Sequence, residues 1–304
     1  MTATAAPSRV ASAQLAAPRF GWTNLAIAAV ALATIGWSVH GTGLSPGLVF
    51  DPSNAKSVTR FVGGLFPPDL SLAFLGSIGR LILETIQISV LGTVIAIVLG
   101  FALGVMALRQ RGEDVSRKAV GTIPWLLRWA SYYASRTILN VLRAVPELVW
   151  ALVFVVAVGL GPVPGGLALA AHSTGILGKL YAEVWESVDQ RLVEAGKSTG
   201  AGNLAVLLFV QLPATLPVVL SYTFFRWECN MRAATLLGFV GAGGVGSQLV
   251  ISMKLFQYQE VATLTLAILG LVILVDVAGQ IIRTRILDPS VSSCNTVARP
   301  ELAE

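Results

Sequence analysis

The sequence predicts an all-α, polytopic membrane protein, on the basis of its composition, the length of its apolar segments and the placement of its positive charges. Of its 304 residues, 55% are hydrophobic and only 12% are charged, whereas soluble domains average about 25% charged residues. So few charges cannot cover the surface of a globule of this size, which argues against a soluble protein with a large core.

Six apolar segments are long enough to cross the hydrocarbon core of a bilayer, which takes about 20 helical residues. They are expected at 22–40, 76–108, 133–160, 163–186, 204–227 and 257–282. We expect three glycines, Gly92, Gly100 and Gly104, to interrupt the second segment. The first segment follows a polar tail and precedes no small-residue cleavage site, so it predicts a transmembrane helix rather than a cleaved signal peptide.

The Lys and Arg residues predict the orientation of these segments. If the N-terminus lies inside, twelve fall in inner connections and four in outer ones, which predicts that both termini are cytoplasmic. The expected organisation is a cytoplasmic tail (1–21), a first transmembrane helix (22–40), an extracytoplasmic segment (41–75), a core of five transmembrane helices (76–285) and a cytoplasmic tail (286–304). The charges are dispersed and are not interleaved with aromatic residues, so we expect no nucleic-acid partner.

The extracytoplasmic segment contains one amphipathic stretch, residues 54–66. Val58, Phe61 and Val62 fall on one face of a helix, and Pro67 stops the run. This spacing predicts a short helix, either lying in the outer membrane interface or packed as an ordinary extracellular helix.

No catalytic or metal-binding constellation is visible in the sequence. His40 and His172 share no cluster with acids or cysteines, and Cys229 and Cys294 lack metal-ligand spacing. We therefore expect neither an enzyme nor a metal site.

The glycine-rich stretch GAGGVG at 241–246 fits the G-x-G-x-x-G pattern of dinucleotide-binding folds. That motif needs a preceding strand and a βαβ unit, whereas apolar helical segments flank it here. We instead expect Gly241, Gly243 and Gly244 to permit close backbone approach or unusual backbone angles in a re-entrant or gate segment.

Ionisable residues inside apolar segments are costly and normally face a bundle interior or a watery path. The candidates for a translocation path are Glu147, Arg226, Glu228, Asn230 and Arg232. Arg226 and Arg232 could attract an anion near the outer mouth, because a guanidinium matches tetrahedral oxyanions with a fork of donors. The alternative is that Arg226, Glu228 and Arg232 form a structural ion-pair network or extend to the membrane surface.

A polar stretch, EAGKSTGAGNLAVLLFVQLP at 194–213, separates two apolar segments. Residues 189–199 can form about three helical turns, in which Ala195 and Gly196 let another surface approach the backbone. Gly200 suits the left-handed conformation that ends a helix.

The chain then returns to the membrane. Asn203 is placed to cap the next helix, and Pro213 would break its regular hydrogen-bond ladder. Together these features predict a short helix on the cytoplasmic face, rigidly joined to a bent membrane helix and able to transmit a push.

This stretch resembles the conserved cytoplasmic loop of ABC-importer permeases, EAA-x3-G-x9-I-x-L-P. The matching positions, all at unchanged spacing, are Glu194, Ala195, Gly196, Gly200, Val210, Leu212 and Pro213. Gly196 stands in place of the second alanine and Val210 in place of isoleucine, both of similar character. Seven defined positions in about twenty residues make the match a specific one.

The resemblance extends over roughly residues 70–285. The segments 143–162, 167–189, 230–246 and 255–269 are similar to the phosphonate-uptake permease. Permeases for methionine and other small solutes share the fold and the glycine-rich loop, so the cargo rests on overall similarity rather than on a ligand motif.

What this resemblance implies is a type I ABC importer permease fold in the bacterial cytoplasmic (inner) membrane. It implies a second permease subunit (a copy or a paralogue), two ATPase subunits that each receive a loop at about 187–203, and an extracytoplasmic binding protein near 230–254. The chain has no G-x4-G-K-[ST] sequence, so ATP and Mg would be used by the partner ATPases and this chain would bind no cofactor.

Several alternatives stay open. The cargo of such a permease could be phosphonate, phosphate, phosphite or methionine. A secondary transporter would show an internal repeat or paired broken helices, and an intramembrane enzyme would need a reactive cluster. Neither class explains the loop at 194–213.

Overall fold

The computed structural model describes residues 22–43, 52–108 and 122–297. All regular structure in these ranges is helical, which confirms the all-α prediction. The chain divides into two compact units, Met1–Gly63 and Gly64–Glu304.

The first unit contains α1 (Trp22–Gly41) and most of α3 (Pro52–Gly64). The side chains of α1 that are described are exposed all around the helix, as expected of a single span surrounded by lipid. Helix α3 forms where the amphipathic spacing predicts it, and Val58 and Val62 on its apolar face are exposed. Its location in the membrane interface stays a prediction.

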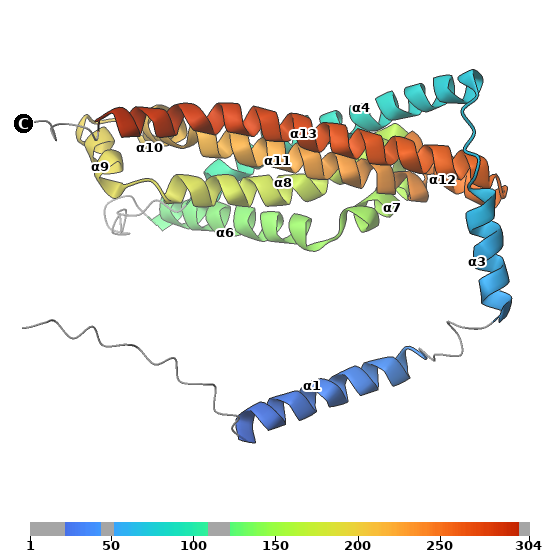
Figure 1. Cartoon of the computed structure of the whole chain (residues 1–304). Coiled ribbons are helices and arrows are strands. Elements are labelled where there is room, and N and C mark those ends of the chain that lie inside the picture. The colour runs from blue at the N-terminus through green and yellow to red at the C-terminus, as the bar shows by residue number, and fades with distance from the viewer. Residues whose placement is uncertain (1–21, 44–51, 109–121, 298–304) are drawn as a thin grey trace, which may run out of the picture. The chain divides into compact units, whose positions relative to one another are not determined.

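The second unit is a bundle of long helices that run side by side (Figure 1). These helices are α4 (Leu72–Met106), α6 (Thr122–Ala144), α8 (Pro162–Glu186), α11 (Leu212–Leu237) and α13 (Tyr258–Val297). The shorter α7 (Glu147–Val158) follows α6, α9 (Gln190–Ser198) lies at one end of the bundle, and α12 (Gly244–Lys254) lies at the other (Figure 1).

Helix α8 occupies the centre of this unit and packs most extensively against α4. The three glycines of α4 lie at this contact: Gly92 faces the backbone of Gly166, and Gly100 and Gly104 face the backbone of Gly178. Helix α4 continues through all three without a break, so the expected interruption is wrong. The glycines instead bring two backbones together, as small residues do between membrane helices.

Among the described residues, four segments are long and apolar enough to cross a membrane: 24–41, 72–106, 203–254 and 258–284. The expected span at 133–160 is not one continuous helix, because α6 and α7 meet at 93° at Val145–Pro146. That bent pair would make a fifth span. Helix α8 coincides with the expected segment 163–186 but is more polar, which its position between other helices permits.

Candidate functional site

The predicted coupling residues lie on or next to α9. Asp189 caps this helix by accepting a hydrogen bond from the backbone N–H of Arg191 at 2.9 Å, as N-cap carboxylates do. Val193 is buried, whereas Glu194 and Ala195 are exposed on the outer side of the helix. Helix α9 therefore presents Glu194 and Ala195 to its surroundings and holds its own position through Val193.

Gly196 faces the interior of the chain. A Cβ at this glycine would stand 3.1 Å from Val210 Cγ2 and 3.5 Å from Val206. The surface that approaches the backbone of Gly196 therefore belongs to the same chain, and it joins α9 to the next membrane helix. Gly200 adopts φ +81°, and its N–H donates to the carbonyl of Lys197. This confirms the expected left-handed end of the helix.

The return to the membrane differs from the prediction in two details. Asn203 is the first residue of α10 (Asn203–Val206), whose N-cap is Gly202, so the expected cap at Asn203 is wrong by one position. The ladder is irregular, as Pro213 predicts, but the irregularity is a π-helical turn at Leu207–Gln211 that precedes α11. Such turns interrupt α-helices and are frequent at functional sites.

The π-helical turn connects α9 to the core of the bundle. The Nε2 of Gln211 donates to the carbonyl of Trp185 at 3.2 Å, and Trp185, at the end of α8, is fully buried. Leu207 and Leu212 pack into the same apolar cluster, whereas Pro213 is exposed. A displacement of α9 would therefore shift side chains that directly contact the end of α8.

The glycine-rich stretch lies at the opposite end of the bundle, between the 3₁₀ turn Gly238–Val240 and α12. Gly241, Gly243 and Gly244 have φ values of +85°, +81° and +73°, a region that side chains rarely adopt. A Cβ at Gly244 would stand 2.6 Å from Thr85 Oγ1. The expected unusual backbone angles and close approach are both present.

Glu84 of α4 also lies at the glycine-rich end of the bundle, and it was not among the residues predicted from the sequence. A Cβ at Gly243 would stand 2.5 Å from Glu84 Oε1 and 3.2 Å from the nitrogen of Pro162. The carboxyl group of Glu84 thus lies directly against the backbone of Gly243. The signal was available, because Glu84 is an ionisable residue inside an apolar segment.

Arg226 and Asn230 of α11 join a chain of hydrogen bonds that crosses three helices. Arg226 Nε donates to Ser173 Oγ at 3.0 Å, Ser173 donates to Asn230 Oδ1 at 2.8 Å, and Asn230 Nδ2 donates to Thr93 Oγ1 at 2.9 Å. Thr93 in turn donates to the carbonyl of Ser89. Ser173, Asn230 and Thr93 are buried, and Arg226 is half-buried.

Glu147 pairs with a histidine that the sequence analysis set aside. Its Oε2 lies 3.3 Å from His172 Nε2, while His172 Nδ1 donates to the carbonyl of Val145 at 2.9 Å. His172 therefore does lie beside an acid, contrary to expectation. It also satisfies a carbonyl that the break between α6 and α7 leaves free.

Glu228 and Arg232 are paired with α13 rather than with Arg226. Glu228 is buried, and its two oxygens lie 3.1 and 3.2 Å from Arg283 Nη2. Arg232 Nη2 lies 3.5 Å from Asp276 Oδ1. Glu228 and Arg232 thus belong to one group of charges with Arg283 and Asp276 of α13, whereas Arg226 bonds to Ser173 of α8 and lies outside that group.

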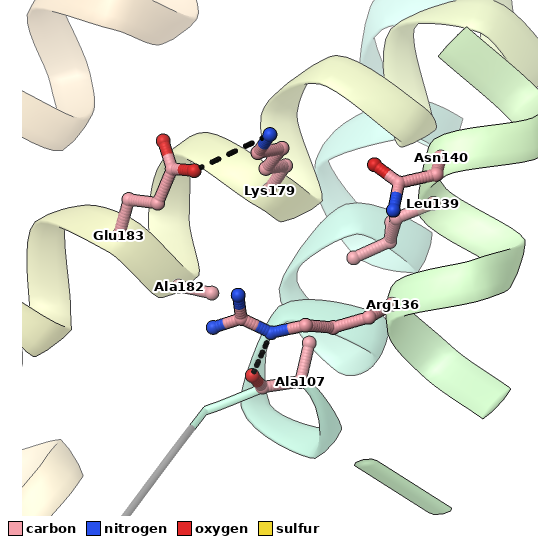
Figure 2. A pocket seen from close by; sticks show the side chains of 7 residues that line it. All are labelled: Ala107, Arg136, Leu139, Asn140, Lys179, Ala182 and Glu183. Atoms are coloured by element: carbon pink, nitrogen blue, oxygen red, sulfur yellow. Dashed lines mark hydrogen bonds and ion pairs between the residues drawn. The ribbon is translucent and has the colours of Figure 1, made fainter. Parts of the chain in front are cut away.

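A small cavity of about 60 Å³ opens between α6, α8 and the end of α4 (Figure 2). Its cations are already engaged. Arg136 Nη2 lies 2.7 Å from Glu186 Oε1 and its Nε donates to the carbonyl of Ala107, while Lys179 lies 3.5 Å from Glu183. This cavity therefore offers no free cation to an incoming anion.

Comparison with known proteins identifies the family. Residues 121–293 match the family described as binding-protein-dependent transport system inner membrane component, and this chain belongs to it. It is the membrane component of a binding-protein-dependent ABC importer and a multi-pass protein of the bacterial inner membrane. In that role it is a transport subunit and not the catalytic one.

Two relatives and one solved structure are informative. The chain is 40% identical over 227 residues to a phosphite transport system permease protein of Stutzerimonas stutzeri, covering 75% of this chain and 77% of the relative. It is 40% identical over 117 residues, or 38% and 96% of the two chains, to a putative cryptic phosphonate transport system permease protein of Escherichia coli.

The fold also matches a known structure. A chain of the MetNI methionine ABC transporter in an inward-facing conformation superposes with a TM-score of 0.59 at 19% identity, covering 71% of this chain and 99% of that one. This confirms the type I ABC importer permease fold.

Proposed function

We propose that this permease imports phosphorus oxyanions delivered by an extracytoplasmic binding protein. The observation that carries the proposal is the 40% identity to a phosphite permease, which extends over three quarters of both chains. The similarity to a phosphonate permease supports the same class of cargo. A doubly charged anion cannot cross hydrocarbon unaided, because desolvating it costs tens of kcal/mol in the Born limit.

Phosphite, phosphonate and phosphate are each named as the cargo of a relative of this chain. The sequence analysis favours phosphonate, whereas the longer of the two alignments described above is to a phosphite permease. Both anions present a tetrahedral phosphorus with several charged oxygens, as phosphate does, so one set of donors can serve all three. Methionine is the weaker candidate, because the methionine transporter shares only the fold at 19% identity.

In the assembly that we propose, two copies of this permease, or this chain and a paralogue, enclose the path through the bilayer. Two ATPase subunits hydrolyse ATP with Mg, and each docks on one α9 through the surface around Glu194 and Ala195. The binding protein delivers cargo at the opposite end, near α12. Glu84, Gly243 and the glycine-rich stretch then form an outer gate.

The experiment that tests the cargo uses the complete transporter. We would reconstitute the permease with its ATPases in proteoliposomes, add the loaded binding protein, and measure ATP-dependent uptake of phosphite, methylphosphonate, phosphate and methionine. The proposal expects uptake of phosphite or methylphosphonate at the highest kcat/KM. ATP-dependent uptake of methionine, with none of the three phosphorus anions carried, would refute it.

A further inference from the structure

We propose that Arg226 is the residue on which an oxyanion cargo binds within the membrane, and that the Glu147–His172 pair keeps this arginine available. The inference rests on the proposed function, because it assumes that the cargo is an oxyanion. It goes beyond that function by assigning the contact to one side chain, by separating Arg226 from Arg232, and by giving roles to Ser173, Asn230, Thr93 and His172.

Most of the hydrogen-bond donors of Arg226 are unused among the described residues. A guanidinium has five N–H donors in a fixed fork, and among the described residues only the Nε of Arg226 has a hydrogen-bond partner. The other arginines of the bundle discussed above, Arg136, Arg232 and Arg283, each face a carboxylate within 3.5 Å. Arg80 and Arg143 also lack a carboxylate partner among the described residues, but both are exposed, whereas Arg226 is half-buried and its Nε is fixed on a buried serine. A half-buried arginine without a carboxylate is costly in a membrane helix, so its unused fork indicates a ligand.

Buried hydrogen bonds orient the guanidinium of Arg226. The hydrogen bonds from Arg226 through Ser173 and Asn230 to Thr93 all run in one direction, with each group donating to the next. Ser173 has no proton left for a ligand, because it donates to Asn230 and accepts from Arg226. These buried residues therefore position Arg226: they hold its Nε toward α8 and leave both Nη groups to a ligand. Two Nη groups can bind two oxygens of one tetrahedral anion in a bidentate manner.

Glu147 acts electrostatically on Arg226, yet no carboxylate oxygen among the described residues lies within ion-pair distance of it. Glu147 is instead paired with His172 at 3.3 Å. His172, which precedes Ser173 on α8, thus holds the carboxylate that would otherwise neutralise the arginine and compete with cargo.

Arg226 and Glu147 are both partly exposed, with the side chain of Glu147 at 32%. They lie where the backbone breaks sharply at Val145–Pro146. Irregular backbone at membrane depth is tolerated where it is buried in protein or lines a water-filled cavity. Part of the Arg226 side chain is therefore accessible from outside the packed core of this chain.

The test compares Arg226→Gln, Arg226→Lys and the control Arg80→Gln in the complete reconstituted transporter, with phosphite as the probe. Arg80 is an exposed arginine of α4 and controls for loss of one positive charge. We expect Arg226→Gln to lower kcat/KM for uptake by about tenfold or more, the loss typical of a charge-assisted contact. Arg226→Lys should retain part of the activity, and Arg80→Gln should stay within about twofold of wild type.

A second measurement, ATP hydrolysis stimulated by the loaded binding protein, distinguishes a variant that has lost its contact with cargo from one that no longer folds or assembles. We expect Arg226→Gln to keep this stimulation while uptake falls, because α9 and its contacts are unchanged. If uptake of phosphite by Arg226→Gln equals that of wild type, the assignment of Arg226 is wrong and the cargo assignment stands. If the wild-type transporter carries methionine and no phosphorus anion, the cargo assignment is wrong, and the role proposed for Arg226 is wrong with it.

The role of the Glu147–His172 pair has its own test. His172→Ala should lower uptake, because the released Glu147 is free to pair with Arg226, and the double variant His172→Ala, Glu147→Gln should restore it. A merely structural histidine would give the opposite result, since removing a second polar partner would not rescue transport. Failure of Glu147→Gln to restore uptake would overturn this part of the proposal.

Discussion

At the scale of single residues, the bundle depends on glycines placed where another group needs the space. A Cβ on Gly279 of α13 would overlap the carboxylate of Glu228, whose oxygens are held by Arg283. Removing water from a buried carboxylate is costly unless its partner is well placed. The ion pair between Glu228 and Arg283 therefore requires a residue without a side chain at position 279.

We predict that Gly279→Ala destabilises the protein by about 1–3 kcal/mol, the usual cost of overpacking. Gly270→Ala is the matched control, because it lies on the same helix and its Cβ would meet nothing within 4 Å. The thermal midpoint of the purified protein in detergent should fall for Gly279→Ala and stay level or rise for Gly270→Ala. Equal midpoints in the two variants would show that Glu228 adapts without loss.

At the scale of elements, the connection from α9 to α11 is a short path of direct contacts. Gly196 packs on Val210, and Gln211 binds the carbonyl of Trp185 in the core. The left-handed residue Gly200 sets the direction in which the chain leaves α9. This element therefore depends on one backbone conformation as much as on any side chain.

We predict that Gly200→Ser reduces the amount of cargo carried per ATP, because a side chain at positive φ costs about 1–2 kcal/mol and shifts α9. Gly202→Ser is the control: it has φ −68° at the N-cap of α10, where serine is favourable. Neither glycine has a neighbour within 4 Å that a side chain would meet, so a difference between the two reports on the backbone alone. Equal coupling ratios would contradict the prediction.

Sequence patterns predicted the helices of this bundle well and their irregularities less well. Apolar length located α4, α11 and α13, and the polar stretch ending at Gly200 located α9. The bend at 145–146 was missed, although Pro146 between Arg143 and Glu147 marks it in the sequence. The span was drawn from overall hydropathy, which does not report the direction of a helix.

The contacts of the candidate site depend on tertiary packing. His172 is 25 residues from Glu147 in sequence, and the two meet only because α8 packs on α7. Arg226 and Glu228 are both ionisable residues in the same apolar segment. They face different helices because side chains two positions apart on a helix point about 200° apart. The residue types were predictable, and their partners were not.

At the scale of the whole molecule, the proposed mechanism requires α9 and α12 to lie on opposite sides of the membrane. The bundle places these helices at its two ends (Figure 1). The excess of Lys and Arg in the connections on the α9 side predicts that α9 is cytoplasmic.

Cysteine labelling tests this orientation. We predict that Lys254→Cys, at the end of α12, reacts with a membrane-impermeant maleimide on intact spheroplasts, and that Ser198→Cys on α9 reacts only after permeabilisation. Both side chains are exposed, and Cys229 and Cys294 would first be replaced by alanine. Labelling of Ser198→Cys in intact spheroplasts would reverse the orientation and with it the direction proposed for transport.

The glycine contact between α4 and α8 limits how this bundle can change shape. Gly92, Gly100 and Gly104 each lie against backbone of α8, so any sliding of one helix along the other would drive a neighbouring side chain into that backbone. The hydrogen bond from Asn230 to Thr93 ties α11 to the same pair at mid-length. We therefore expect α4, α8 and α11 to move as one body when the transporter changes shape.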